Sequence, residues 1–93
     1  MPTIRRQMID LLSATAMSAR DLSQALGIRE KDVYAHLPHV AQSVRRNGSR
    51  LEIRPFTCLA CGYRFTGRKR FTRPGRCPQC KASRIETPLY LIV

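Results

Sequence analysis

Several features that define common protein classes are missing from this 93-residue sequence. No apolar run approaches the roughly 20 residues that a membrane-spanning helix needs. The first residues, Met1 to Arg5, contain no apolar segment typical of a secretory signal peptide. The sequence also has no paired carboxylates, no nucleophile with an adjacent base and no glycine-rich phosphate-binding loop. We therefore expect a soluble, cytoplasmic protein that binds a partner and is not an enzyme.

Acidic residues are few, and their uneven placement gives the sequence a strong local charge. The chain has 17 Lys and Arg against six Asp and Glu, for a formal net charge of +11. Residues 45–84 hold twelve of the basic side chains and only one acid, Glu52, whereas residues 1–44 are close to neutral. Fourteen of the basic residues are arginine, whose planar guanidinium group suits phosphates and base edges. This pattern favours a nucleic-acid partner over a merely solvated surface.

All four cysteines lie in two Cys-x-x-Cys pairs that are separated by fifteen residues. Two such loops facing each other supply four thiolates at the corners of a tetrahedron, which is the usual coordination of structural zinc. Gly62 follows the first pair, where a backbone with positive φ is expected. Residues 51–93 are too few to fold stably without a bound metal ion. We predict one structural Zn²⁺ ion, bound by Cys58, Cys61, Cys77 and Cys80.

Other cysteine chemistries fit the sequence less well. Disulfides would need an oxidising compartment, and a redox pair would be expected beside a βαβ pattern, which the sequence does not contain. Iron is the closer competitor, because both pairs resemble the metal-binding loops of rubredoxin-like modules and a tetrahedral sulfur site accepts either metal. The arginine-rich surroundings suit a polyanion better than electron transfer. They favour zinc and leave a rubredoxin-like iron redox protein as an alternative.

Apolar side chains at helical spacing predict three helices in the first half of the chain. The first helix begins at Thr3, a plausible N-cap. Ser18 starts the second in a capping-box-like Ser-x-x-Asp pattern, and Gly27 ends it with left-handed backbone. The third carries an apolar stripe to Val44, but we expect a kink or break at Pro38, which lacks a backbone donor. Three such helices with short turns are typical of a helix-turn-helix core.

The second half of the chain changes to the alternation typical of strands. Residues 51–54 and 63–65 alternate apolar and polar side chains, and residues 67–70 are predicted to form a hairpin tip. Residues 89–93 are the most β-prone stretch, and we predict that they pair with residues 51–53 or pack against the helices.

These patterns together predict an α+β fold with two domains. Residues 1–50 would form a helix-turn-helix domain of three to four helices. Residues 51–93 would form a small antiparallel β zinc ribbon that ends in a C-terminal strand. Phe65 and Phe71 are expected to shield the metal rather than to stack on unpaired bases, because so small a ribbon has few other apolar groups.

The stretch from Ser18 to Leu37, SARDLSQALGIREKDVYAHL, resembles the helix-turn-helix of winged-helix repressors of the ArsR-like kind. The whole chain is similar to a group of small prokaryotic predicted transcriptional regulators that carry a helix-turn-helix fused to a zinc ribbon. This resemblance implies DNA contacts on the third helix, at the positions Arg29, Lys31, Tyr34 and Ala35. Arg29 stands where such helices usually have a capping Ser or Thr.

We therefore expect a DNA-binding transcriptional regulator that grips double-stranded DNA largely through arginine–phosphate contacts. Reading two half-sites would call for a homodimer. The alternative is an RNA-binding module or an adaptor within the transcription or translation machinery. Besides the third-helix positions above, the predicted nucleic-acid contacts are Arg46, Arg64, Arg68, Lys69, Arg70, Arg73 and Arg76.

Overall fold

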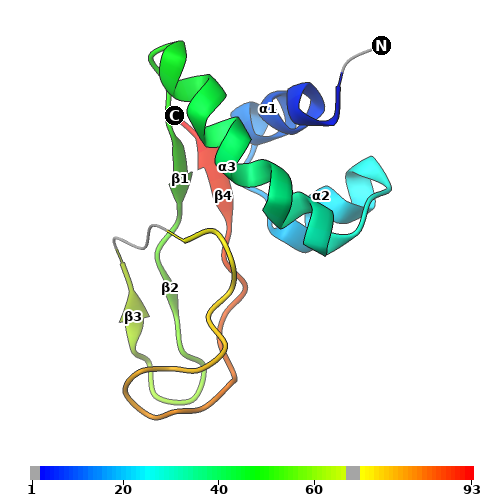
Figure 1. Ribbon diagram of the computed structural model, residues 1–93. Helices are drawn as coiled ribbons and strands as arrows, with labels where there is room; N and C mark the ends of the chain where they lie inside the picture. Colours follow the sequence, from blue (N-terminus) through cyan, green and yellow to red (C-terminus); the bar gives the residue numbers. More distant parts are fainter. Residues whose placement is uncertain (1–2, 67–69) are drawn as a thin grey trace.

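The computed structural model describes residues 3–66 and 70–93, and within them the helices gather at one end of an elongated molecule (Figure 1). The molecule measures 45 × 28 × 19 Å along its principal axes. The predicted α+β fold class is confirmed. None of the helices in the described part of the chain is both long and apolar enough to cross a bilayer. The elements, in chain order, are α1 (Ile4–Ala14), α2 (Ala19–Leu26), α3 (Glu30–Arg46), β1 (Leu51–Ile53), β2 (Phe56–Thr57), β3 (Arg64–Phe65) and β4 (Tyr90–Ile92).

The first two helices begin at side-chain caps that are visible in the sequence. The N–H of Arg6 donates to Thr3 Oγ1 at 3.2 Å at the start of α1. Ser18 and Asp21 form a reciprocal capping box at the start of α2, because each side chain accepts from the other residue's backbone N–H at 3.0 Å. Gly27 ends α2 in the left-handed region, with a φ of 67°. These predicted caps are confirmed, and they satisfy backbone groups that a helix end would otherwise leave open.

The third helix differs from the expectation, because α3 runs through Pro38 as one helix. Of the predicted kink or break at residues 37–38, the break is wrong, and the kink stays a prediction. An interior proline costs a helix roughly 3 kcal/mol, but α3 is held on both sides of it by packing. The side chains of one face are buried in the core: Val33, Leu37, Val40 and Val44. Tertiary packing of this face outweighs the local preference against helix.

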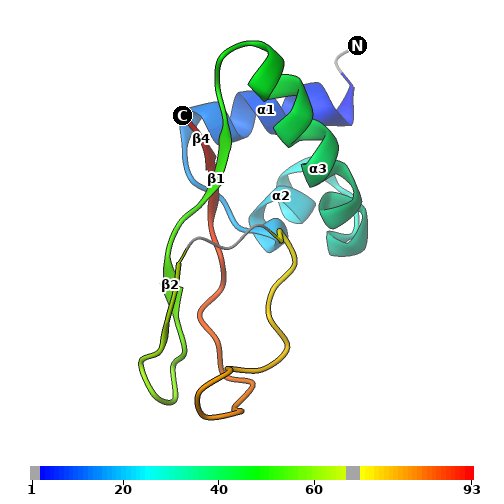
Figure 2. The ribbon, with the colours of Figure 1, turned by 60° about the vertical axis from the view of Figure 1, so that its left-hand side comes forward.

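The C-terminal strand returns to the helices and pairs antiparallel with β1 (Figures 1 and 2). Leu51 lies opposite Ile92, and Ile53 lies opposite Tyr90, which confirms the predicted pairing. On the other edge of β4, Tyr90 exchanges two backbone hydrogen bonds with Met17, at 2.8 and 2.9 Å. The connection between α1 and α2 therefore adds a third strand-like contact to the sheet, and the sequence pattern did not indicate it.

Two hydrophobic clusters fill the interior. The helical cluster contains the buried faces of α1, α2 and α3 together with Tyr90, and both β1 and β4 pack against it. The ribbon cluster consists of Phe56, Cys58, Phe65, Cys77 and Ile85. Ile53 packs against both clusters and so links them. The strands β1 and β4 thus belong to the core of the helices, while the cysteine loops have a small core of their own.

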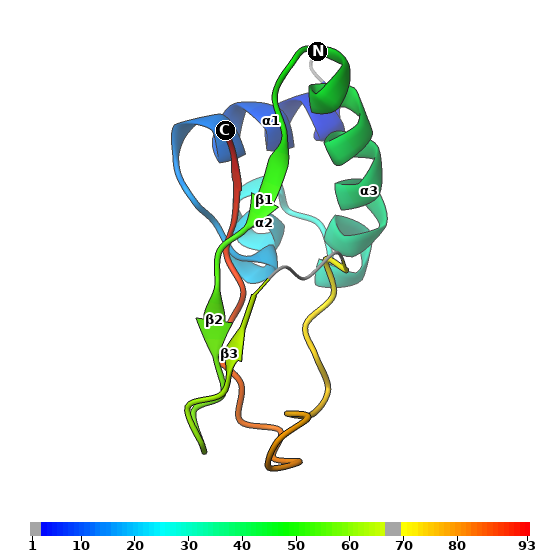
Figure 3. The same ribbon diagram turned by 90° about the vertical axis from the view of Figure 1, so that its left-hand side faces the viewer.

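The segment that follows Arg70 returns beside α3 before it reaches the second cysteine pair (Figure 3). Phe71 packs on the helical cluster and meets the Tyr90 ring edge-on, with a centroid distance of 6.2 Å. The Tyr90 hydroxyl donates to the Phe71 carbonyl, and the Tyr34 side chain hydrogen bonds to the Tyr90 side chain. We call Tyr34, Phe71 and Tyr90 the tyrosine junction. The expectation that Phe71 shields the metal is wrong, because Phe71 covers the helical core.

Candidate metal centre and nucleic-acid interface

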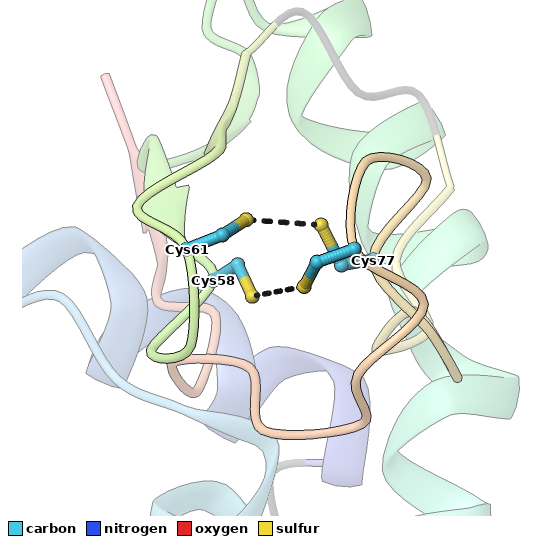
Figure 4. A group of neighbouring side chains, drawn as sticks. Cys58, Cys61 and Cys77 are labelled. Atoms are coloured by element: carbon cyan, nitrogen blue, oxygen red, sulfur yellow. Dashed lines mark hydrogen bonds between the residues drawn. The ribbon is translucent and has the colours of Figure 1, made fainter.

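The two cysteine loops lie at the end of the ribbon that is distant from the helices, and their sulfur atoms converge (Figures 1 and 4). All four Sγ atoms lie within 4.8 Å of one another. The Sγ atoms of Cys58 and Cys80 are 3.6 Å apart, as are those of Cys61 and Cys77. A Zn–S bond of about 2.3 Å places the sulfurs of a tetrahedron about 3.8 Å apart. The four cysteines therefore have the spacing that a tetrahedral metal ion requires.

Both loops have the same backbone design. The residue after the second cysteine donates its N–H to the carbonyl of the first, Gly62 to Cys58 and Lys81 to Cys77, at 2.9 Å in each case. Both donors have left-handed backbone, with φ of 80° and 64°. Among the described residues, Lys81 is the only non-glycine residue with positive φ. This turn aims two cysteine side chains at one point, and the sequence indicated it only where a glycine was present.

Each loop supplies one buried and one exposed sulfur ligand. Cys58 and Cys77 are at most 2% exposed and belong to the ribbon cluster, whereas Cys61 and Cys80 are exposed. Phe65 lies in the same cluster, as expected of a residue that shields the metal. A metal ion bound here would be covered by apolar side chains on one side and reachable from solvent on the other.

Backbone amides prepare part of this cluster for a cation. Burial would raise the pKa of Cys58, but hydrogen bonds from the N–H groups of Cys61 and Ala60 outweigh it and lower this pKa to about 7. The Cys61 sulfur accepts from the Tyr63 N–H, which favours the thiolate. Burial and the surrounding sulfurs nevertheless raise the pKa of Cys61 to about 12. At neutral pH a metal ion would therefore displace a proton from Cys61, as thiolate coordination requires.

Three of the predicted nucleic-acid contacts on α3 lie on an open face of the helix. Lys31, Ala35 and Arg46 are exposed, which agrees with the helical phase of the apolar stripe. Two further exposed positions of this face, His39 and Gln42, separate them. The face is available to a partner, and its contact with nucleic acid stays a prediction.

The other two positions that the resemblance indicated, Tyr34 on α3 and Arg29 just before it, interact with other residues of the protein. Tyr34 is half-buried in the tyrosine junction, and burial, together with nearby Glu30, raises its pKa. Arg29 is exposed, but its Nε lies 3.3 Å from a carboxylate oxygen of Asp32. Arg29 also precedes α3 without a side-chain cap, as predicted. Tyr34 therefore has a packing role that the sequence did not reveal.

The ribbon presents exposed arginines at every predicted position that the structure describes: Arg64, Arg70, Arg73 and Arg76. Arg68 and Lys69, with most of the predicted hairpin tip, lie outside the described residues. The Arg73 guanidinium donates to the Ile85 carbonyl and so also fastens the ribbon.

The single acid of the basic region does not neutralise the ribbon arginines. Glu52 pairs with Arg50, with a distance of 2.9 Å between Nη2 and Oε1. Within residues 3–66 and 70–93, no carboxylate lies within 4.0 Å of a guanidinium nitrogen of Arg64, Arg70 or Arg76. Their charge is therefore available to an anionic partner.

Comparison with known proteins places these features in a family. Residues 3–51 match the family described as PF0610-like, N-terminal. The structure is similar to the solution NMR structure of protein PF0610 from Pyrococcus furiosus, with a TM-score of 0.82 and 30% sequence identity. This similarity covers 97% of this chain and 88% of that chain. A search of curated proteins finds no match. The family description does not mention ArsR-like repressors, so that resemblance stays a prediction.

Proposed function

We propose that this chain, which belongs to the PF0610-like family, is a DNA-binding transcriptional regulator with a zinc ion in its ribbon. The observation that carries this proposal is a set of exposed ribbon arginines that no carboxylate of the described residues accompanies, namely Arg64, Arg70 and Arg76. Arginine binds phosphate through two parallel hydrogen bonds, which gives both affinity and orientation. A basic surface of this kind, next to a helix-turn-helix, suits the backbone of duplex DNA.

The order of the elements supports the helix-turn-helix part of the proposal. The turn at Gly27 joins α2 to α3, and α3 exposes Lys31 and Ala35 near its start. The strands β1 and β4 follow α3 and pair with each other, which is also the order in a winged helix. In this chain the cysteine ribbon occupies the connection between those two strands, where a winged helix has the tip of its wing. The ribbon arginines would then contact DNA beside the groove that receives α3.

We propose zinc as the bound metal, because an arginine-rich surface suits a polyanion better than electron transfer. When bound, zinc would supply a redox-inert charge that holds four thiolates together. Backbone N–H groups of the first loop would orient Cys58 and Cys61 toward it, and the Gln79 N–H would do the same for Cys77 in the second loop. Metal analysis and colour test this assignment, with one zinc per chain and a colourless protein expected. A red protein with one iron per chain would overturn it and favour the rubredoxin-like alternative.

The salt dependence of duplex binding tests the proposed function. Six phosphate contacts from the ribbon would give a log–log slope of affinity against salt near −5, at roughly −0.9 per contact. Changing Arg64 and Arg70 together to alanine should weaken binding to all sequences alike and make the slope about 2 units shallower. The matched control changes Arg5 and Arg6 on α1, which removes the same charge at the other end of the molecule. A slope between 0 and about −2 for the unmodified protein, or equal effects from both pairs, would overturn the proposal.

Selection from a random duplex pool tests whether the protein reads sequence. Enrichment of a palindrome with half-sites about ten base pairs apart would indicate a homodimer that inserts α3 into successive major grooves. Lys31→Ala should then change the preferred sequence more than the overall affinity. Preference for single-stranded RNA over duplex DNA would instead favour the RNA-binding alternative.

A further inference from the structure

A hollow of about 410 Å³ lies on the ribbon, between β3 and the approach to the second cysteine loop. Its size is at the lower end of the range of small-molecule sites, roughly 300–1,000 Å³. None of the described residues that line it is acidic. One wall is formed by Tyr63, Arg64 and Thr66, and the other by Pro74, Arg76 and Pro78.

An aromatic ring with a fixed orientation forms part of this hollow. Tyr63 is half-buried and meets Phe65 edge-on, with a centroid distance of 5.1 Å. Phe65 in turn stacks on Phe56 at 4.7 Å, so the Tyr63 ring rests on a buried aromatic column. Because the ring is already held in place, it loses little conformational entropy when a flat ligand stacks on it. Tyr63 is therefore suited to stacking on a flat ligand, whereas Phe65 is buried in the ribbon cluster and Phe71 packs against the helical cluster.

The charge of the hollow selects the chemistry of its ligand. Arg64 and Arg76 are both exposed, and the described part of the chain places no carboxylate within salt-bridge distance of either. A hollow lined by an aromatic ring and by two arginines matches a nucleobase together with its neighbouring phosphates. A purely apolar ligand would leave both charges unused, and an acidic peptide would not need the tyrosine. A nucleotide uses both features.

We propose that this hollow binds a single unpaired nucleotide of DNA, whose base stacks on Tyr63 while Arg64 and Arg76 hold the adjacent phosphates. This inference rests on the proposed DNA-binding function. It adds to that function a preference for duplex DNA in which one base is displaced from the helix. The protein would bind duplex DNA through its basic surface and would prefer sites where one base is extruded. Base–aromatic stacking tolerates any base, so the preference should depend on the extruded base being present rather than on which base it is.

The test compares three versions of one duplex with the zinc-loaded protein: perfectly paired, with one bulged thymidine, and with an abasic residue in the bulge. We expect the thymidine bulge to bind roughly tenfold more tightly than both of the others. Tyr63→Phe should keep this preference, and Tyr63→Leu should lose it while still binding the perfect duplex. Equal affinity for all three duplexes overturns the inference and leaves the proposed function in place. Failure to bind any duplex overturns both.

A photocrosslink keeps the test independent of variants that fold poorly. A bulged 4-thiothymidine should crosslink to Tyr63 in the unmodified protein, as mapped by mass spectrometry. Crosslinking confined to α3 or to Phe71 would overturn the proposed site. Free thymidine monophosphate distinguishes the source of the nucleotide, since we expect it to compete weakly. Protection of Tyr63 by the mononucleotide, with no preference for the bulge, would assign the hollow to a free nucleotide and overturn the DNA assignment.

Discussion

Two residues, Gly62 and Lys81, shape the four-cysteine cluster by adopting left-handed backbone at equivalent positions of the two loops. The turn lets each donate to the carbonyl four residues earlier and aims two sulfurs inward. Glycine adopts this geometry freely, whereas other L-residues bear a cost of about 1–2 kcal/mol. A Cβ at Gly62 would meet no atom of the described residues within 4 Å, so the backbone conformation sets the cost of a side chain there.

We predict that Gly62→Ala weakens zinc binding about tenfold, because the variant strains the loop that holds Cys58 and Cys61. Lys81→Gly should strengthen zinc binding by a few-fold, since it relieves the same strain in the second loop. Competition with a chromophoric chelator measures both effects. Gly75→Ala is the matched control, because its Cβ also meets open space and its φ is not positive. Equal affinities for the Gly62 and Gly75 variants would contradict the prediction.

Among the secondary-structure elements, α3 shows how packing overrides a local signal. Pro38 removes the backbone donor that the Tyr34 carbonyl would use in a regular helix. The helix continues because Leu37 and Val40, on either side of the proline, are fully buried. Pro38 itself is exposed and, with Tyr34, lines a hollow against residues 70–72. The proline thus lies where α3 faces the returning segment of the ribbon.

We predict that Pro38→Ala raises the free energy of unfolding by about 1–3 kcal/mol, because alanine restores the missing donor and favours helix. Chemical denaturation with saturating zinc, followed by far-UV circular dichroism, measures this change. His39→Ala, at the adjacent exposed position, should change stability by at most about 0.5 kcal/mol. A less stable Pro38→Ala variant would mean that the contact of Pro38 with residues 70–72 outweighs the helical gain.

At the level of the whole molecule, the helical core and the cysteine ribbon share a narrow boundary. The boundary consists of Ile53, which packs against both clusters, and the tyrosine junction, which binds the returning segment to α3. The helical cluster contains no cysteine. Binding of a structural zinc ion is worth roughly 10–16 kcal/mol, and the ribbon has few other sources of stability. The two parts should therefore respond differently to loss of the metal.

We predict that Cys77→Ser unfolds the ribbon and leaves most of the helical signal of α1, α2 and α3 in place. The melting temperature of the helices should fall, because the contact of Phe71 with Tyr90 is lost with the ribbon. Circular dichroism and NMR chemical-shift dispersion measure the two parts separately. Chelation of zinc from the unmodified protein should produce the same spectra. A single cooperative loss of all structure would contradict the prediction and show that the two clusters fold as one unit.

The features that the sequence predicted correctly depend on a few neighbouring residues. The caps at Thr3 and Ser18 use side chains that contact the backbone three residues away. The end of α2 depends on a single glycine, Gly27. The convergence of the cysteines follows from the spacing within each pair. Two short turns of this kind can supply one tetrahedral site wherever the rest of the chain places them.

The sequence by itself thus determined the starts of α1 and α2, the pairing of the four cysteines in two converging loops and the concentration of arginine beyond residue 44. Tertiary structure alone decided that α3 continues through Pro38, that Met17 joins the sheet at Tyr90, and that Phe71 packs on the helices. Tertiary structure also decided that Tyr34 packs in the tyrosine junction and that Tyr63 lines the hollow on the ribbon. The physical reason is the range of the contacts involved. Periodicity and spacing report on neighbouring residues, whereas these positions depend on partners from other segments of the chain, which meet only when the protein has folded.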